Sequence, residues 1–176
     1  GQRVALIGAG GIGFDVAEYL VHKGESSTLD PKRWMAEWGV DPTFETRGSL
    51  VKPQPEAPAR EVWLLQRSAG KPGARLGKTS GWVHRATLKA KQVKMLGGVE
   101  YLGVNDSGLK IRIDGSEQLL PVDHVVVCAG QEPRRELQAE LLAAGITAHL
   151  IGGADVAAEL DAKRAIDQGS RLAAAL

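Results

Sequence analysis

The sequence predicts an α/β fold in which helices cover a parallel sheet, and three observations predict it. First, the apolar run Arg3 to Ile7 leads into a glycine-rich turn and then into the periodic segment Phe14 to Lys23, which is the order strand, turn, helix. Second, further apolar runs, Glu61 to Gln66 and His124 to Cys128, recur along the chain with helical patterns between them. Third, three short runs between residues 100 and 122 are separated by Asp/Gly turns, which predicts an antiparallel meander added to the sheet.

The glycine-rich turn carries the strongest functional signal. Gly8, Gly10 and Gly13 fit the pattern G-x-G-x-x-G, with Gly11 between them. One glycine permits the tight turn, one lets the backbone approach a pyrophosphate, and one allows close contact between helix and strand. Free N–H groups and the positive end of the helix dipole then face the phosphates. We therefore predict a Rossmann-like dinucleotide site, against the alternative of a turn that binds nothing. We expect Gly10→Ala or Gly13→Ala to weaken nucleotide binding by more than about tenfold in a domain that stays folded.

Composition limits the classes of function. The chain has 176 residues, enough for one well-buried domain with an appendage. Its 22 basic and 21 acidic side chains nearly cancel, which argues against nucleic acid or an anionic membrane as partner. The single cysteine, Cys128, excludes an internal disulfide framework and a cysteine-based metal cluster, and it is compatible with a reducing compartment. No run approaches 18 apolar residues and no signal peptide is recognisable, so we expect a cytoplasmic protein. The chain starts without methionine at the edge of a strand, as an excised piece of a larger protein would.

Residues 24–60 form a predicted insertion, because a second strand normally follows the first helix within a few residues. The insertion holds five of the eight prolines. Asp30 and Pro31 predict the N-cap and first turn of a short helix that runs to Trp38. Trp34 and Trp38 are four apart and would share one helical face, which favours packing onto the rest of the domain over binding a partner protein.

An arginine follows the second strand, at the place where a dinucleotide fold meets the adenosine ribose. NAD-specific sites usually carry Asp or Glu there, but this chain has Gln66-Arg67. A guanidinium fork favours a 2′-phosphate, so the position argues for NADP. We also consider Lys71 and Lys78 to be phosphate ligands, because they lie in the same glycine-rich loop.

The surrounding segment is strongly basic. Between Glu61 and Glu100 there are eight basic residues and no acidic residue; the basic ones are Arg67, Lys71, Arg75, Lys78, Arg85, Lys89, Lys91 and Lys94. We expect the last three of these to complement the C-terminus of a helix and to face water.

The remaining segments complete the predicted fold. Their expected bounds are a helix at 80–90, a strand at 93–96, meander strands at 100–104, 109–113 and 118–122, and a helix at 134–145. His124 to Cys128 is nearly all apolar, as a central strand should be, and Cys128 reads as a small core residue. From Thr147 we expect one more strand, then a turn carrying Asp155, then a helix from about Leu160 to the end. The four histidines are scattered without acidic partners at ligand spacing, so we expect no metal site, and no Ser/His/Asp or paired-carboxylate constellation occurs.

Several motifs occur together in one order. They are Gly8 to Gly13, Leu64-Leu65-Gln66-Arg67, Lys71-Pro72-Gly73, Leu76 to Trp82, Val127 to Pro133 and Leu150 to Asp155. With the proline-rich insertion, this set resembles the C-terminal part of the bacterial NADPH-dependent 2,4-dienoyl-CoA reductases. That family joins an FMN-bearing barrel and an iron–sulfur (4Fe-4S) cluster to a glutathione-reductase-like FAD/NADPH unit.

The resemblance implies that two parts of the chain bind different cofactors. Residues 1–145 would be the NADPH domain, and residues 146–176 would be a segment of the FAD domain, where Asp155 would hydrogen-bond the flavin's ribityl chain. The partners would be the remaining FAD, FMN and iron–sulfur parts of the parent enzyme, which degrades unsaturated fatty acids in β-oxidation. The first glycine-rich unit of the FAD domain, the cysteine cluster and the FMN barrel are absent from this sequence. The chain alone would therefore dock NADPH and pass hydride to FAD without reducing an enoyl group.

We expect the cofactor site to comprise residues from three parts of the chain, with no residue assigned to catalysis. They are Gly8, Gly10, Gly11 and Gly13, then Arg67, Ser68, Lys71, Lys78 and Thr79, and finally Gly130 and Asp155. A second interpretation is a non-catalytic module that holds ADP, as in flavoproteins resembling trimethylamine dehydrogenase. Arg67 argues against it, because ADP has no 2′-phosphate. A third is a docking domain that binds a partner through Trp34 and Trp38.

Overall fold

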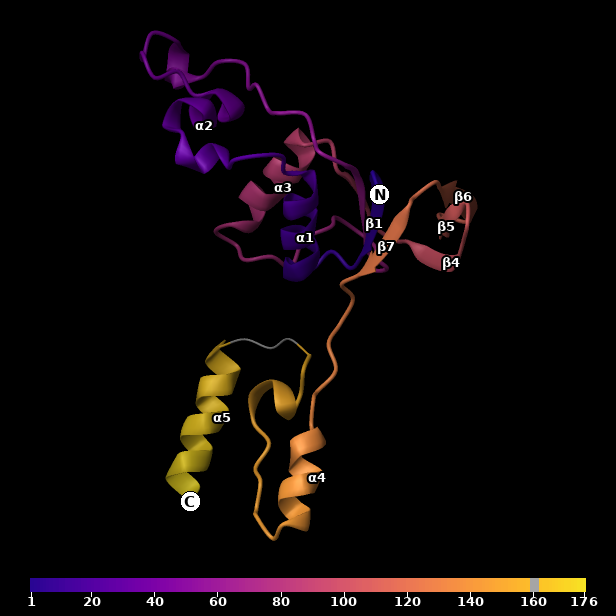
Figure 1. Cartoon of the computed structure of the whole chain (residues 1–176). Coiled ribbons are helices and arrows are strands. Elements are labelled where there is room, and N and C mark those ends of the chain that lie inside the picture. The colour runs from indigo at the N-terminus through magenta and orange to yellow at the C-terminus, as the bar shows by residue number, and fades with distance from the viewer. Residues whose placement is uncertain (159–161) are drawn as a thin grey trace. The chain divides into compact units, whose positions relative to one another are not determined.

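A computed structural model describes residues 1–158 and 162–176 of the chain. The chain forms two compact units, Gly1–Ala129 and Gly130–Leu176, which are described separately (Figure 1). The predicted boundary after residue 145 concerns which cofactor each part would bind, and it stays a prediction.

The first unit is built on a four-stranded parallel sheet. Its strands are β1 (Arg3–Ile7), β2 (Glu61–Leu65), β3 (Lys94–Leu96) and β7 (His124–Val127). Their order is β3-β2-β1-β7, and every neighbouring pair is parallel. Leu6 lies opposite Leu64 on one side and Val126 on the other. The prediction that residues 3–7 form an interior strand of a parallel sheet is therefore confirmed.

Alternation along the strands divides the core between the two faces of the sheet. On one face, Leu6 and Leu64 pack with the buried side of α1 (Gly11–Val21) and with Leu88 of α3 (Gly81–Ala90). Both helices lie on the same side of the sheet (Figure 1). The buried α1 residues, Phe14, Ala17 and Val21, are spaced by three and four, which places them on one helical stripe.

The opposite face is covered by the antiparallel meander (Figure 1). Its strands are β4 (Glu100–Asn105), β5 (Gly108–Ile113) and β6 (Ser116–Leu120), in the order β4-β5-β6. Leu109, Ile111 and Leu120 pack against Trp63 and Leu65, the alternate residues of β2. The predicted meander is confirmed, with strand ends that differ by a few residues.

The insertion contains α2 (Pro31–Trp38) between two single-turn helices, η1 (Ser27–Leu29) and η2 (Arg47–Ser49). The Asp30 carboxylate caps α2 by accepting from the N–H groups of Lys32 and Arg33 at 3.0 and 3.3 Å. The Trp34 and Trp38 rings contact each other, with centroids 6.2 Å apart.

An ion pair ties the insertion to α3. Lys91, directly after α3, lies 3.2 Å from the Glu37 carboxylate, and both side chains are largely buried. The expectation that Lys91 faces water is wrong. Hydrogen bonds from Ser27 and Lys91 outweigh the opposing effect of burial and lower the pKa of Glu37. Lys94 also has partners, because its amino group pairs with Glu61 and lies 4.3 Å from the centre of the Trp63 ring.

β7 differs from the expected central strand. Within the described residues it pairs only with β1, so it forms an edge of the sheet, and Val127 is 70% exposed. Its apolar run is explained by contacts of Val125 and Val126 with the two core clusters rather than by a strand on each side. Cys128 is half-buried rather than a core residue. Burial nevertheless raises the pKa of its thiol.

The second unit contains α4 (Glu136–Ala143), the single turn η3 (Gly152–Ala154) and α5 (Ala162–Ala175). The strand expected from Thr147 does not form. A strand needs a neighbour for its backbone N–H and C=O groups, and no described segment pairs with residues 147–151. The predicted helix start at Leu160 lies outside the described residues. Over the described ranges, none of the helices is both long and apolar enough to cross a bilayer.

Candidate dinucleotide-binding site

The glycine turn joins the carboxyl end of β1 to the first turn of α1. The Gly8 N–H donates to the Leu65 carbonyl at 2.8 Å, so the turn begins as an extension of the sheet. Gly8 has a φ of +113°, and an added Cβ would lie 2.5 Å from the Cys128 carbonyl oxygen. A side chain at Gly13 would meet the Gly8 carbonyl oxygen at 1.8 Å. Gly8 is therefore required by the close approach of the chain that leaves β7, and Gly13 by the packing of α1 against the sheet.

Gly10 and Gly11 have a different environment, because no described heavy atom other than those of adjacent residues and of the helix's own backbone lies within 4 Å of a Cβ built on either. Gly10 is the N-cap of α1, and the first hydrogen bond of the helix runs from the Phe14 N–H to its carbonyl at 3.1 Å. The N–H groups of the first turn thus precede the helical hydrogen-bond ladder. Open space beside free donors and the positive helix end fits a pyrophosphate.

The same geometry corrects one expectation. A contact at 1.8 Å with a backbone atom cannot be relieved by rotating a side chain, so Gly13→Ala must shift α1 or β1. Gly13→Ala is therefore expected to lower stability as well as binding, whereas Gly10→Ala remains a test of binding alone.

The loop after β2, residues 66–80, is hydrogen-bonded to the turn that precedes β4. The Gln66 N–H donates to Leu96 O at 2.9 Å, and Gln66 O accepts from the Val99 N–H at 3.0 Å. The Gly98 N–H donates to Ser68 O at 2.9 Å. The two segments touch so closely that a Cβ at Gly97 would lie 2.1 Å from the backbone oxygen of Gly70. The Gln66 side-chain amide donates to the same oxygen at 3.2 Å.

The middle of the same loop contacts α1. Gly73 has a φ of +73°, and a Cβ there would lie 2.6 Å from Cζ of Phe14, a first-turn residue of α1. The Arg85 guanidinium of α3 donates to the Gly73 carbonyl at 2.7 Å. The structure thus holds the basic loop against the helix whose N-terminus forms the glycine turn.

The basic residues separate into two groups. Arg85, Lys91 and Lys94 have partners within the protein. The side chains of Arg67, Lys71 and Lys78 are exposed, and none of them makes a hydrogen bond or ion pair with a residue that the structure describes. The three cations that the sequence assigned to phosphate thus have no protein partner among the described residues, and the same holds for Arg75 and Lys89. Ser68 and Thr79 lie exposed on the same loop.

Gly130 and Asp155 belong to the second unit. Gly130 has a φ of +93° in the segment before α4. The Asp155 carboxylate accepts from the Gln168 side-chain amide at 2.9 Å, and the oxygen of the same amide accepts from the Gly152 N–H at 2.7 Å. Gln168 lies on α5, so this helix holds the carboxylate in a half-buried position.

Sequence reasoning missed two residues near the first-unit site. Arg75 is a further exposed cation without a described partner on the same loop, and the basic run was the signal that pointed to it. Tyr101, on β4, has a buried hydroxyl with no hydrogen-bond partner among the described residues. The sequence around Tyr101 gave no signal, because tyrosine is common in strands. Whether its hydroxyl is buried and hydrogen-bonded depends on tertiary packing.

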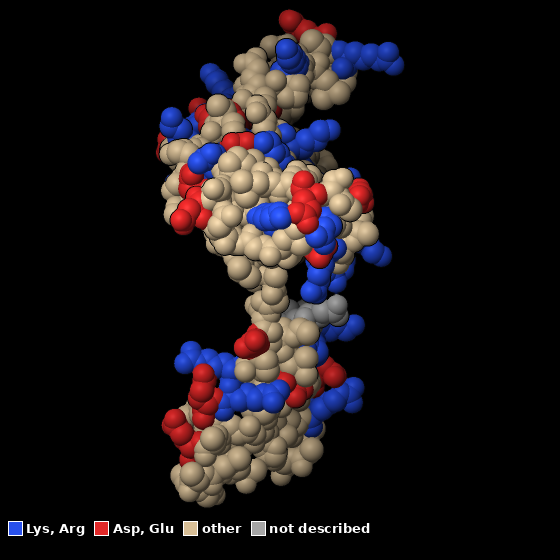
Figure 2. All heavy atoms as spheres, turned by 90° about the vertical axis from the view of Figure 1, so that its right-hand side faces the viewer, with Lys and Arg blue, Asp and Glu red and all other residues tan. Residues whose placement is uncertain are grey.

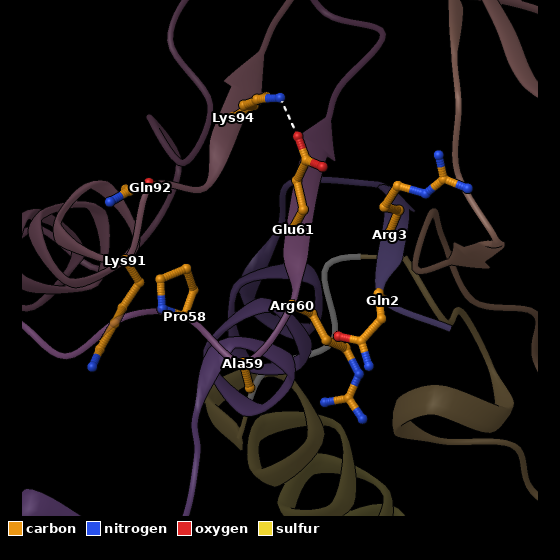
Figure 3. Close-up of a pocket in the computed structure, with 9 residues that line it drawn as sticks. All are labelled: Gln2, Arg3, Pro58, Ala59, Arg60, Glu61, Lys91, Gln92 and Lys94. Carbon is orange, nitrogen blue, oxygen red and sulfur yellow. Dashed lines mark hydrogen bonds and ion pairs between the residues drawn. The ribbon is translucent and has the colours of Figure 1, made fainter.

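A hollow of about 430 Å³ lies at the opposite edge of the sheet, where the strands begin (Figure 3). Figure 3 shows Lys94 pointing to Glu61, while Lys91 and Arg3 lie on opposite sides of the view. The four lining cations already have partners: Lys94 pairs with Glu61, Lys91 with Glu37, Arg3 with Asp123 at 2.7 Å, and Arg60 donates to the Leu20 carbonyl at 3.2 Å. Ligands of parallel sheets bind outside the carboxyl ends of the strands, so this hollow is not the nucleotide site.

Charge is mixed over one face of the molecule. On the face shown in Figure 2, Lys and Arg side chains alternate with Asp and Glu, without a broad patch of one sign.

The chain is similar to parts of several reductases and dehydrogenases. It is 26% identical over 139 residues to a metal reductase of Desulforamulus reducens, a match that covers 78% of this chain and 20% of the relative. Its fold resembles 2-naphthoyl-CoA reductase in a complex with 2-naphthoyl-CoA, with a TM-score of 0.61, 20% identity, and coverage of 96% of this chain and 20% of that one. It also resembles histamine dehydrogenase from Rhizobium sp. 4-9, with a TM-score of 0.64, 16% identity, and coverage of 98% and 23%. The chain thus spans about a fifth of the length of these proteins.

The whole sheet, the meander and most of the second unit fall within one family match. The model described as pyridine nucleotide-disulphide oxidoreductase matches residues 1–163. This family assignment implies NAD(P)H and FAD as cofactors, in agreement with the glycine turn and its Rossmann-like sheet. The chain belongs to the pyridine nucleotide-disulphide oxidoreductase family.

Proposed function

We propose that the first unit binds NADPH and that the chain is the NADPH-binding part of a multi-cofactor flavoprotein resembling 2,4-dienoyl-CoA reductase. One observation carries the proposal. The open glycine turn lies at the N-terminus of α1, and the loop of residues 66–80 contacts the same helix. The cations of that loop have no protein partner among the described residues. A ligand with a pyrophosphate and an additional phosphate matches both features.

The basic loop supplies the preference for NADPH over NADH. The Arg67 guanidinium can form paired, charge-assisted hydrogen bonds to a 2′-phosphate, each contributing about 1.5–3 kcal/mol. Lys71 and Lys78 add positive charge without a fixed geometry, and their exposure leaves that charge screened by solvent. The pyrophosphate would be held by the first-turn N–H groups beside Gly10 and Gly11.

The bound nicotinamide would supply a hydride, for which a flavin is the acceptor in the proposed enzyme. Asp155 in the second unit would accept a hydrogen bond from the flavin's ribityl chain, oriented by Gln168. The remaining FAD, FMN and iron–sulfur parts would be partners of this chain, because one cysteine cannot ligate a 4Fe-4S cluster. The substrate of the whole enzyme would be an unsaturated fatty acyl-CoA, processed in the cytoplasm.

A titration of the chain with NADPH, NADH and ADP, followed by tryptophan fluorescence, tests the proposal. We expect NADPH to bind about ten to a thousand times more tightly than NADH. Gly10→Ala should abolish most of the binding of both dinucleotides. Equal affinity for ADP and NADPH would refute the proposal and favour a non-catalytic module that holds ADP.

A further inference from the structure

The side chain of Gln66 closes the turn that follows β2. Its amide nitrogen donates to Ser68 O at 3.0 Å and to Gly70 O at 3.2 Å. A primary amide has two N–H donors, and both are directed to this one turn. Because the two acceptors are carbonyl oxygens, only the nitrogen end of the amide can face them, which fixes the orientation of the side chain.

The backbone of Gln66 is anchored independently of its side chain. Its N–H donates to Leu96 O at 2.9 Å, and its carbonyl accepts from the Val99 N–H at 3.0 Å. A Cβ at Gly97 would lie 3.4 Å from the Gln66 amide nitrogen, so the amide lies between the turn it closes and the turn before β4. The end of β2 thus gives the amide a fixed base.

Arg67 lies inside the turn that the amide closes, directly before Ser68. Its side chain is exposed and makes no hydrogen bond or ion pair with a residue that the structure describes. At the far end of the turn, Gly70 has a φ of +92°, a conformation that favours glycine. Since no contact of its own holds the guanidinium, its direction depends on the backbone of residues 67–70, which the two Gln66 hydrogen bonds hold.

We propose that Gln66 is a positioning residue for the choice of NADPH over NADH. Its amide holds residues 67–70 in the conformation that directs Arg67 to the nucleotide's 2′-phosphate, where a planar fork needs a defined approach to form paired hydrogen bonds. The inference rests on the proposed function and adds to it a residue that sets selectivity without contacting the phosphate. The glycine turn, and with it the binding of the pyrophosphate, would not depend on Gln66.

Gln66→Met tests the inference, because it keeps the size of the side chain and removes both donors. The side chain is half-buried and the backbone hydrogen bonds of Gln66 remain, so the fold should survive. The ligands are NADPH and NADH, together with adenosine 2′,5′-bisphosphate and AMP, which differ by the same 2′-phosphate and lack nicotinamide. We expect Gln66→Met to weaken NADPH and the bisphosphate about tenfold and to leave NADH and AMP within about twofold.

Two further variants and a control sharpen the test. Gln66→Asn keeps an amide that is one methylene shorter and cannot span both carbonyls, so it should match Gln66→Met. The double variant Gln66→Met/Arg67→Ala should bind NADPH no more weakly than Arg67→Ala alone, because a positioning residue has no effect once the group it positions is gone. Gln54→Met is the control, since Gln54 is exposed in the insertion without a side-chain hydrogen bond to a described residue, and it should change none of the affinities.

The outcomes separate the two proposals. Wild-type protein that binds NADPH no better than NADH, and the bisphosphate no better than AMP, would refute the 2′-phosphate site and the role of Gln66 with it. A wild-type preference for NADPH that both Gln66 variants preserve would refute the role of Gln66 alone. An equal loss of all four nucleotides, or a further loss in the double variant, would also refute it, because either result would show that Gln66 does not act through Arg67.

Discussion

Two alanine substitutions in the glycine turn should separate binding from folding. Gly10 has a φ of −86° and an added methyl would contact no described heavy atom, so Gly10→Ala should change the free energy of unfolding by less than about 1 kcal/mol. The methyl would occupy the space through which a pyrophosphate approaches the first-turn N–H groups, and we expect NADPH affinity to fall more than about tenfold, or 1.4 kcal/mol.

Gly13→Ala should mainly lower the stability of the fold. Its methyl would lie 1.8 Å from the Gly8 carbonyl oxygen and 3.4 Å from Cδ1 of Leu64, so the helix must move away from the sheet. Overpacking of this kind costs about 1–3 kcal/mol. For a domain of this size that is a fall in melting temperature of about 3–12 °C.

The assay combines thermal unfolding followed by circular dichroism with NADPH titration of each variant below its melting range. We expect a large loss of binding with a small change in melting temperature for Gly10→Ala, and a large change in melting temperature for Gly13→Ala. The reasoning fails if Gly10→Ala binds NADPH as tightly as the wild type. It also fails if Gly13→Ala melts at the wild-type temperature.

Further substitutions examine other parts of the structure. Arg67→Ala should reduce NADPH affinity about tenfold or more and leave NADH unchanged; an equal loss of both would mean that the arginine packs on the adenine or holds the loop. Lys71→Ala should have a smaller effect that shrinks as salt rises, measured by titration at two ionic strengths. Lys91→Ala should speed proteolysis within residues 24–60, because it breaks a largely buried ion pair, whereas Lys89→Ala at an exposed position should not. Hydrogen bonds from the Arg3 side chain, and then from the backbone N–H groups of Arg3 and Gln2, hold the pKa of Asp123 well below its usual range. Its contribution to stability is therefore present above the unfolded pKa of about 4 and lost as pH falls, so wild type should lose more melting temperature between pH 6 and pH 2 than Asp123→Asn does.

Local patterns predicted the first unit well. The strand, turn and helix of residues 3–21 follow from one apolar run, one glycine pattern and one periodic segment, each of which is encoded within a few residues. The meander follows from turn residues such as Asp114 and Gly115, which both adopt positive φ. These features need no knowledge of distant contacts.

The errors concern features that depend on distant partners. Residues 147–151 have the composition of a strand, but a strand exists only where another strand accepts its hydrogen bonds. The sequence predicts that Lys91 is solvated at the end of a helix, because its partner, Glu37, lies 54 residues earlier in the insertion. The place of β7 at the sheet edge likewise depends on what lies beside it, which its own sequence does not encode.

The close contact between Gly70 and Gly97 bears on attempts to change the cofactor preference of this protein. Here any replacement that moves the backbone at Gly70 meets the turn at Gly97, where no side chain fits, and disturbs the hydrogen bonds that position β4. Residues 66–70 and 96–99 therefore constitute a single module, and a graft that transfers both should retain its fold where a transfer of the first alone should not.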